Sequence, residues 1–156
     1  MSFEAKISDP AVFAQRASVL ARPLVFTNGV FDILHRGHVT YLARARALGA
    51  SLVVALNSDA SARRLGKGDD RPINTLADRM AVIAALEAVA LVTWFDEDTP
   101  LARILECRPE HLVKGGDWPA DKIVGAKEVR SWGGKVHSIA FEHDRSTTKL
   151  LSKIRA

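Results

Sequence analysis

Short apolar runs alternate along the chain with longer segments in which apolar side chains recur every three or four positions. The runs LVFTN, SLVVAL, LVTWF, HLVKGG and KVHSIAF have the length of strands and are rich in β-branched and aromatic residues. This pattern is typical of buried β-strands. We therefore predict strands at residues 24–28, 51–56, 91–95, 111–116 and 135–141.

The segments between these runs have helical periodicity, and several carry signals for helix ends. Thr75 is placed to cap one helix, and Pro100 opens another behind Asp98 or Thr99 as its cap. The polar segment 57–74, which contains glycines and a proline, is expected to be a loop. The predicted helices cover residues 10–20, 36–49, 75–89, 101–107, 121–134 and 147–155.

Strands that alternate with helices predict an α/β fold, here a Rossmann-like, doubly wound, five-stranded parallel sheet with helices on both faces. The 156 residues suit a single domain, with residues 1–22 as an N-terminal helical extension and residues 23–156 as the catalytic core. Ligands of such sheets bind beyond the carboxyl ends of the strands. The segments FTNGVFD, LNSD and VKGGDW follow three predicted strands, so we expect the chemistry at that edge.

Composition narrows the classes of function. Lys and Arg outnumber Asp and Glu by 22 to 18, a mild excess that suits an anionic small substrate. There is no basic run with interleaved aromatic residues, so nucleic-acid binding is not expected. No apolar run approaches the roughly 20 residues of a membrane helix, and there is no secretory signal, so a cytoplasmic protein without membrane contact is expected. Cys107, the one cysteine, is expected to be a buried thiol.

Two histidines, His35 and His38, flank the predicted start of a helix in the segment FDILHRGHVTYL. They could be metal ligands, core residues or phosphate-binding groups. No third ligand is suitably spaced, so no protein ligand for a metal is expected. Arg36 and Gly37 between them argue against a core position. A helix N-terminus attracts phosphate, and glycine lets the backbone approach an anion, so phosphate binding is favoured.

The segment GVFDILHRGH resembles the GxFDxxHxGH signature of the cytidylyltransferase-like nucleotidyltransferases. The resemblance implies that His35 and His38 bind the nucleotide phosphates and stabilise the transition state. It also implies a phosphate-contacting turn around the motif, made by Thr27, Asn28, Gly29, Phe31, Asp32 and Gly37.

Near the C-terminus, the segment RSTTKLL resembles the late Ser-Thr motif of the same superfamily. By this resemblance Ser146, Thr147 and Thr148 would cradle the outer phosphates at a helix N-terminus. Plain helix capping would use the same residue types.

From about Val25 to the end, the chain resembles bacterial heptose 1-phosphate adenylyltransferases. That resemblance implies a reaction between ATP and D-glycero-β-D-manno-heptose 1-phosphate, giving ADP-heptose and pyrophosphate for the lipopolysaccharide inner core. The sugar phosphate would attack the α-phosphorus directly, with Mg²⁺ carried mainly by the ATP phosphates. Dimers are common in the superfamily, so a homodimer is possible.

Other positions match the family pattern, although ordinary turns or surface arginines would also explain them. The segment formed by Lys114, Gly115, Gly116 and Asp117 corresponds to a loop on the nucleotide side. On the acceptor side the matches are Asn57, Asp59, Arg71 and Arg79, of which Arg79 corresponds to a phosphate-binding arginine. Lys67 is displaced by one position from the lysine of relatives, and Trp118 could belong to the core, the site or an interface.

Two alternatives stay open. A glycerol-3-phosphate-type cytidylyltransferase would keep the fold and mechanism, but its relatives usually read ISTDEF where this chain reads LNSDAS. A noncatalytic nucleotide-binding or RNA-binding module would need neither histidine, yet both are present.

Overall fold

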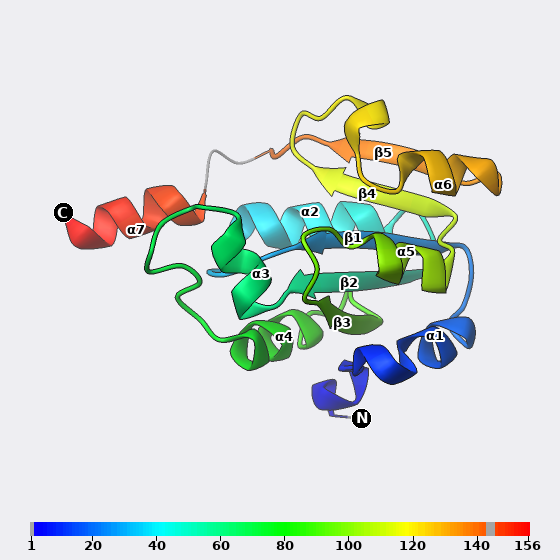
Figure 1. The fold of residues 1–156 in the computed structure, drawn as a ribbon, viewed down its shortest axis with the longest axis horizontal. Helices are drawn as coiled ribbons and strands as arrows, with labels where there is room; N and C mark the ends of the chain where they lie inside the picture. Colours follow the sequence, from blue (N-terminus) through cyan, green and yellow to red (C-terminus); the bar gives the residue numbers. More distant parts are fainter. Residues whose placement is uncertain (1, 143–145) are drawn as a thin grey trace.

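A five-stranded, all-parallel sheet lies at the centre of the computed structural model, which describes residues 2–142 and 146–156 (Figure 1). The strands are β1 (Leu24–Gly29), β2 (Ser51–Asn57), β3 (Leu91–Phe95), β4 (His111–Gly115) and β5 (Lys135–Ile139). Their order in the sheet is β3-β2-β1-β4-β5. The order reverses between β1 and β4, which makes this pair the switch point of a doubly wound sheet. The predicted fold class is confirmed.

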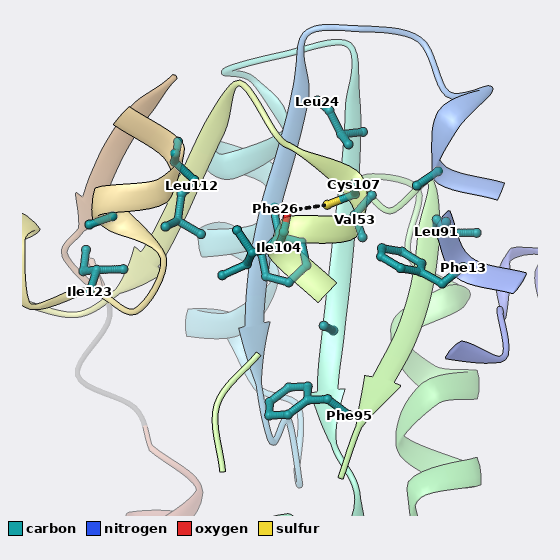
Figure 2. Packing of buried hydrophobic residues seen from close by; sticks show 14 residues of the cluster. Phe13, Leu24, Phe26, Val53, Leu91, Phe95, Ile104, Cys107, Leu112 and Ile123 are labelled. Atoms are coloured by element: carbon teal, nitrogen blue, oxygen red, sulfur yellow. Dashed lines mark hydrogen bonds between the residues drawn. The ribbon is translucent and has the colours of Figure 1, made fainter. Parts of the chain in front are cut away.

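Helices cover both faces of the sheet. On one face, α1, α5 and α6 contribute to a buried cluster with β1, β2 and β3, and on the other α2 and α4 do so (Figure 2 shows the first cluster). The helical elements are η1 (Phe3–Lys6), α1 (Pro10–Ser18), α2 (Arg36–Arg46), α3 (Asp59–Arg64), α4 (Leu76–Ala84), α5 (Leu101–Cys107), η2 (Ala120–Lys122), α6 (Ala126–Ser131) and α7 (Thr147–Arg155).

The two clusters follow from the period of two along each strand. In β2, Val53 lies in the α1/α5/α6 cluster, while Leu52 and Val54 lie in the α2/α4 cluster. A strand buried on both faces reads as a continuous apolar run, as SLVVAL does. Cys107 lies in the first cluster as a buried free thiol, as predicted, and burial raises its pKa to about 12 (Figure 2).

Several predicted helices differ from the observed ones, and those predicted at 10–20 and 36–49 end early, at Ser18 and Arg46. The expected loop 57–74 contains α3, which Ser58 caps by accepting a hydrogen bond from Ser61 N–H. The helix predicted at 121–134 is divided into η2 and α6, because Gly125 has φ +88° and packs too closely on Ile104 for a β-carbon. The helix predicted at 75–89 ends at Ala84.

The predicted caps had different outcomes. Thr75 caps α4, as expected, by accepting from Asp78 N–H. Pro100 itself occupies the N-cap position of α5, with no side-chain capping bond, so the predicted cap by Asp98 or Thr99 is wrong.

The segment before β1 packs against the sheet. Ile7 forms a parallel bridge with Val92, and Ser8 N–H donates to the Val92 carbonyl over 2.8 Å. Phe13 of α1 is fully buried in the α1/α5/α6 cluster. This segment therefore supports the β3 side of the sheet, away from the switch point.

Candidate active site

Two cavities open at the carboxyl ends of the strands, and they share the turn 28–30 and Lys67. The first cavity has a volume of about 490 Å³ and is bordered by Phe31 and Tyr41, which belong to the α2/α4 cluster. The second has about 240 Å³ and is bordered by Phe95 and Ile123, which belong to the opposite cluster. The cavities therefore lie on opposite faces of the sheet and meet at the end of β1.

His35 and His38 line the first cavity at the N-terminus of α2, the helix start beside which the sequence pattern placed them. Their rings stack with centroids 3.9 Å apart. Gly37 N–H donates to His35 Nδ1 over 3.1 Å, and His35 N–H donates to His38 Nδ1 over 3.4 Å. Since both Nδ1 atoms accept, the proton of each neutral ring lies on Nε2.

The environment keeps His38 neutral. Burial is the main cause that lowers the pKa of His38 from 6.5 to about 4, and the electrostatic influence of the neighbouring His35 ring and of Lys67 acts in the same direction. Phe31, which packs edge-on against the His38 ring, has φ +50°, an uncommon conformation for an aromatic residue. Strain of this kind concentrates at functional sites. The pair thus offers hydrogen-bond donors without a fixed charge on His38.

A second helix N-terminus faces the same cavity. Ser146, Thr147 and Thr148 line it at the start of α7. Ser146 Oγ caps the helix by accepting from Lys149 N–H over 3.0 Å, and Thr147 Oγ1 donates to the Ile33 carbonyl over 3.1 Å. The late Ser-Thr motif and the histidine motif, far apart in sequence, therefore meet around one cavity. Two helix N-termini at one site form a strong phosphate-binding arrangement.

Asp32, predicted as a phosphate contact, anchors the loop 71–74. Its carboxylate accepts hydrogen bonds from Arg71 Nε at 2.8 Å and from the backbone N–H groups of Ile73 and Asn74 at 2.9–3.0 Å. Burial by itself would raise the pKa of Asp32, but these backbone bonds and Arg71 together lower it. Both Asp32 and Arg71 line the first cavity, with the Arg71 guanidinium held by Asp32.

Arg79, predicted to bind a substrate phosphate, is a clamp between loops. Its side chain has 0% exposure, and it lines neither cavity. The guanidinium donates to the carbonyls of Val30, Asn57 and Asn74 and to Asp59 Oδ1, over 2.7–3.0 Å. A buried arginine with these four bonds fixes the ends of β1 and β2, and it does not reach a ligand in this conformation.

The second cavity contains Lys114 and Trp118. Lys114 and Gly115 are neighbours in β4, so they point to opposite faces, and Gly115 lines the first cavity instead. Burial, with a contribution from Lys67, lowers the pKa of Lys114. Asn57 also borders the second cavity and donates to Ser61 Oγ. The predicted nucleotide-side loop is thus divided between the two cavities.

Several predicted residues lie outside both cavities, and several lining residues were not predicted. Thr27 is buried and hydrogen-bonded to Tyr41 Oη, and Asp117 is exposed. The predicted residues that line neither cavity are Thr27, Gly37, Asp59, Arg79, Gly116 and Asp117. The unpredicted lining residues include Val30, Tyr41, Lys122 and Phe141. Lys67, left open from sequence, lines both cavities.

Within residues 2–142 and 146–156, no group of three or more His, Cys, Asp or Glu side chains could hold a metal ion. Over the same residues, no helix has both the length and the apolar character needed to cross a membrane.

A switch point that joins two helix N-termini and a histidine pair defines a phosphate-binding α/β protein. The cytidylyltransferase-like family matches residues 26–154, and the chain belongs to this family. It is 59% identical over 155 residues to the D-beta-D-heptose 1-phosphate adenylyltransferase of Bordetella bronchiseptica, covering 98% of this chain and 96% of that protein. It is 58% identical over 132 residues to the bifunctional protein HldE of Cronobacter sakazakii, covering 85% of this chain but only 28% of that protein.

Solved structures agree on the fold. A lipopolysaccharide core biosynthesis protein from Thermoplasma volcanium superimposes with a TM-score of 0.62 at 30% identity, covering 78% of this chain and 98% of that one. A pantoate-beta-alanine ligase from Francisella tularensis superimposes with a TM-score of 0.59 over 91% of this chain and 68% of that one, but at 13% identity it supports the fold alone.

Proposed function

We propose that this protein transfers AMP from ATP to heptose 1-phosphate, giving ADP-heptose and pyrophosphate for lipopolysaccharide core synthesis. The observation that carries the proposal is the 59% identity, over nearly the whole of both chains, to a heptose 1-phosphate adenylyltransferase. The site supports it independently, because two adjoining cavities suit two phosphate-bearing substrates.

The reaction is a single in-line displacement. In this displacement the attacking oxygen and the leaving pyrophosphate lie on opposite sides of the α-phosphorus. ATP binds in the first cavity, where the N-termini of α2 and α7 hold its phosphates. His35 and His38 donate from Nε2 to phosphate oxygens whose negative charge grows in the transition state. The α-phosphorus then lies above the turn 28–30, where the two cavities meet.

The acceptor binds in the second cavity. Lys114 attracts its phosphate, and the exposed indole of Trp118 offers an apolar face to the sugar ring. This assigns Lys114 to the acceptor, whereas the sequence pattern favoured the nucleotide. Lys67, at the boundary of both cavities, is positioned to neutralise the transferred phosphate.

Mg²⁺ enters as part of the substrate, Mg²⁺·ATP. Among the described residues, the first cavity is lined by histidines, Lys67, Arg71 and hydroxyl groups, and the one carboxylate of that set, Asp32, is already bonded to Arg71. This donor set suits phosphate oxygens better than a bare cation, and Mg²⁺ is commonly held by substrate phosphates and water.

The test is pyrophosphate release with Mg²⁺, offering ATP or CTP with heptose 1-phosphate or glycerol 3-phosphate. We expect release only with ATP and the heptose. Release with CTP and glycerol 3-phosphate would replace the proposal by a cytidylyltransferase. Silence with all pairs, together with salt-sensitive RNA binding, would favour a noncatalytic module. A homodimer and a cytoplasmic location stay predictions, the former checked by light scattering.

A further inference from the structure

The first cavity has aromatic lining residues as well as phosphate-binding groups. Three aromatic side chains border this cavity, namely Phe31, Tyr41 and Phe141. Phe31 and Tyr41 are 7% and 4% exposed, so their rings are committed to packing. Phe141 is 47% exposed, which leaves much of its ring available. An available aromatic face beside a phosphate-binding site is a suitable support for a flat heterocycle.

Phe141 has a well-defined seat. A β-carbon placed on Gly115 would lie 2.9 Å from Phe141 Cζ and 3.3 Å from Tyr41 Cε2, so the absence of a side chain at Gly115 lets the Phe141 ring settle there. The Tyr41 ring packs against it with centroids 5.8 Å apart. The ring is therefore supported by the end of β4 and by α2.

The backbone on either side of Phe141 is tied to α2. Arg44 Nη1 forms an ion pair with Glu142 Oε1 at 3.1 Å and donates to the Ala140 carbonyl over 3.4 Å. One guanidinium thus holds the residues before and after Phe141. Phe141 is therefore held in a defined position, whereas an isolated exposed phenylalanine would be ordinary on any protein surface.

We propose that the Phe141 ring is the platform on which the adenine of ATP stacks, and that it contributes to the preference for a purine nucleotide. The inference rests on the proposed function, because it takes ATP as the nucleotide of the first cavity. The cavity that holds the N-termini of α2 and α7 also reaches Gly115 and Phe141, so a nucleotide with its triphosphate at those N-termini has room for its base beside Phe141. A purine presents a larger ring surface for stacking than a pyrimidine does.

The experiment compares binding of Mg²⁺·ATP with binding of Mg²⁺·tripolyphosphate, which has the phosphates but no base, by isothermal titration calorimetry. The variants are Phe141→Ala, Phe141→Leu and Phe141→Tyr. Phe3→Ala is the matched control, since Phe3 is a similarly exposed phenylalanine that lines neither cavity. Binding of Mg²⁺·CTP to each protein completes the set.

We expect Phe141→Ala to weaken ATP binding about 10-fold or more while tripolyphosphate binding stays unchanged. Phe141→Leu should show an intermediate loss, and Phe141→Tyr and Phe3→Ala should bind ATP normally. The affinity ratio of ATP to CTP should fall in Phe141→Ala. Unchanged ATP binding in Phe141→Ala, or an equal loss of tripolyphosphate binding, would overturn the platform. If Phe141→Ala does not fold, the platform is tested by comparing ATP binding to Phe141→Leu with ATP binding to Phe141→Tyr.

The outcome is separable from that of the proposed function. If the wild-type protein binds ATP through Phe141 but releases no pyrophosphate with heptose 1-phosphate, the proposed reaction is wrong and the platform stands. If the wild-type protein is active and Phe141→Ala binds ATP equally well, the platform is wrong and the reaction stands. A wild-type protein that binds no ATP would contradict both.

Discussion

At the scale of single residues, the histidine pair combines two properties that are usually opposed. The side chains are packed against each other and against Phe31, yet they remain hydrogen-bond donors because backbone N–H groups occupy both Nδ1 atoms. The hydrogen bond from a neutral donor strengthens as negative charge develops on a phosphate oxygen. In the ground state a neutral donor forms no tight ion pair that would have to be broken.

Replacing either His35 or His38 by Ala should lower kcat by about 100–1,000-fold, because one preorganised donor to the transition state is lost. Pyrophosphate release under saturating substrates measures this effect. Thermal unfolding and ATP binding serve as controls and should change far less. A variant that kept full kcat would show that its histidine is not a transition-state contact.

The depressed pKa of His38 predicts a pH-dependent contribution to stability. The folded protein holds this imidazole neutral down to about pH 4, whereas the unfolded chain binds its proton near pH 6.5. Between these values the unfolded state binds more protons, so the free energy of unfolding should fall as the pH drops from about 6.5 to about 4. In urea titrations across this window, His38→Asn should lose stability less steeply than the wild type. Equal slopes would contradict the burial of a neutral His38.

Residue types and spacing favoured a phosphate role for the two histidines, and the family resemblance added the Ser-Thr segment; the structure places both segments at helix N-termini beside the first cavity. Residue types did not predict the role of Arg79. Whether a guanidinium faces a ligand or backbone carbonyls depends on where three separate loops end, and that is set by tertiary packing. Asp32 is a similar case, since its partners lie about 40 positions away.

At the scale of elements, the contact of Asp32 with Arg71 joins the loop after β1 to the loop that precedes α4. Asp32→Asn would leave the Arg71 guanidinium, whose side chain is only 10% exposed, without its counter-charge. We expect a loss of about 3 kcal/mol in the free energy of unfolding, because a buried charge is left uncompensated. Urea denaturation at pH 7 measures this loss.

The matched control for that variant is Asp121→Asn, which breaks an exposed ion pair with Arg130. An exposed pair contributes about 0–1 kcal/mol, so this variant should unfold almost like the wild type. The lowered pKa of Asp32 adds a second check. The ionised Asp32 carboxylate should stabilise the fold fully above about pH 3.8, the pKa of an ordinary aspartate. This stabilisation should be lost only as the pH falls through the lower pKa that Asp32 has in the folded protein. Equal losses in the two variants would argue against an anchoring role for Asp32.

The sequence predicted the strands closely, because β1, β2 and β3 are almost continuously buried apolar runs, and β4 and β5 carry shorter runs of the same kind. The wrong helical boundaries have local causes that periodicity does not reveal. The helix α3 is a short capped segment inside a polar stretch, and the break before α6 comes from close packing of Gly125 on Ile104. Both depend on neighbours from other parts of the chain.

At the scale of the whole molecule, the doubly wound sheet separates the two cavities. Helices α2 and α7 border one cavity, and the segment from β4 to η2 borders the other, so the two cavities meet at the sheet edge at residues 28–30 and at Lys67. A doubly wound topology produces such a crevice wherever the strand order reverses. The identity of the acceptor did not follow from this topology; its support comes from similarity to relatives.

This arrangement predicts the stereochemistry of the reaction. If ATP and the acceptor approach one phosphorus from opposite faces of the sheet, transfer is a single displacement, and the configuration at the α-phosphorus should invert. One diastereomer of ATP with sulfur on the α-phosphate, used as substrate with heptose 1-phosphate, should give a product of inverted configuration, read by ³¹P nuclear magnetic resonance. Retention would require two successive displacements and a covalent nucleotidyl-enzyme. In that case a side chain lining the first cavity would have to act as nucleophile, and the two cavities would serve successive steps instead of meeting in one transition state.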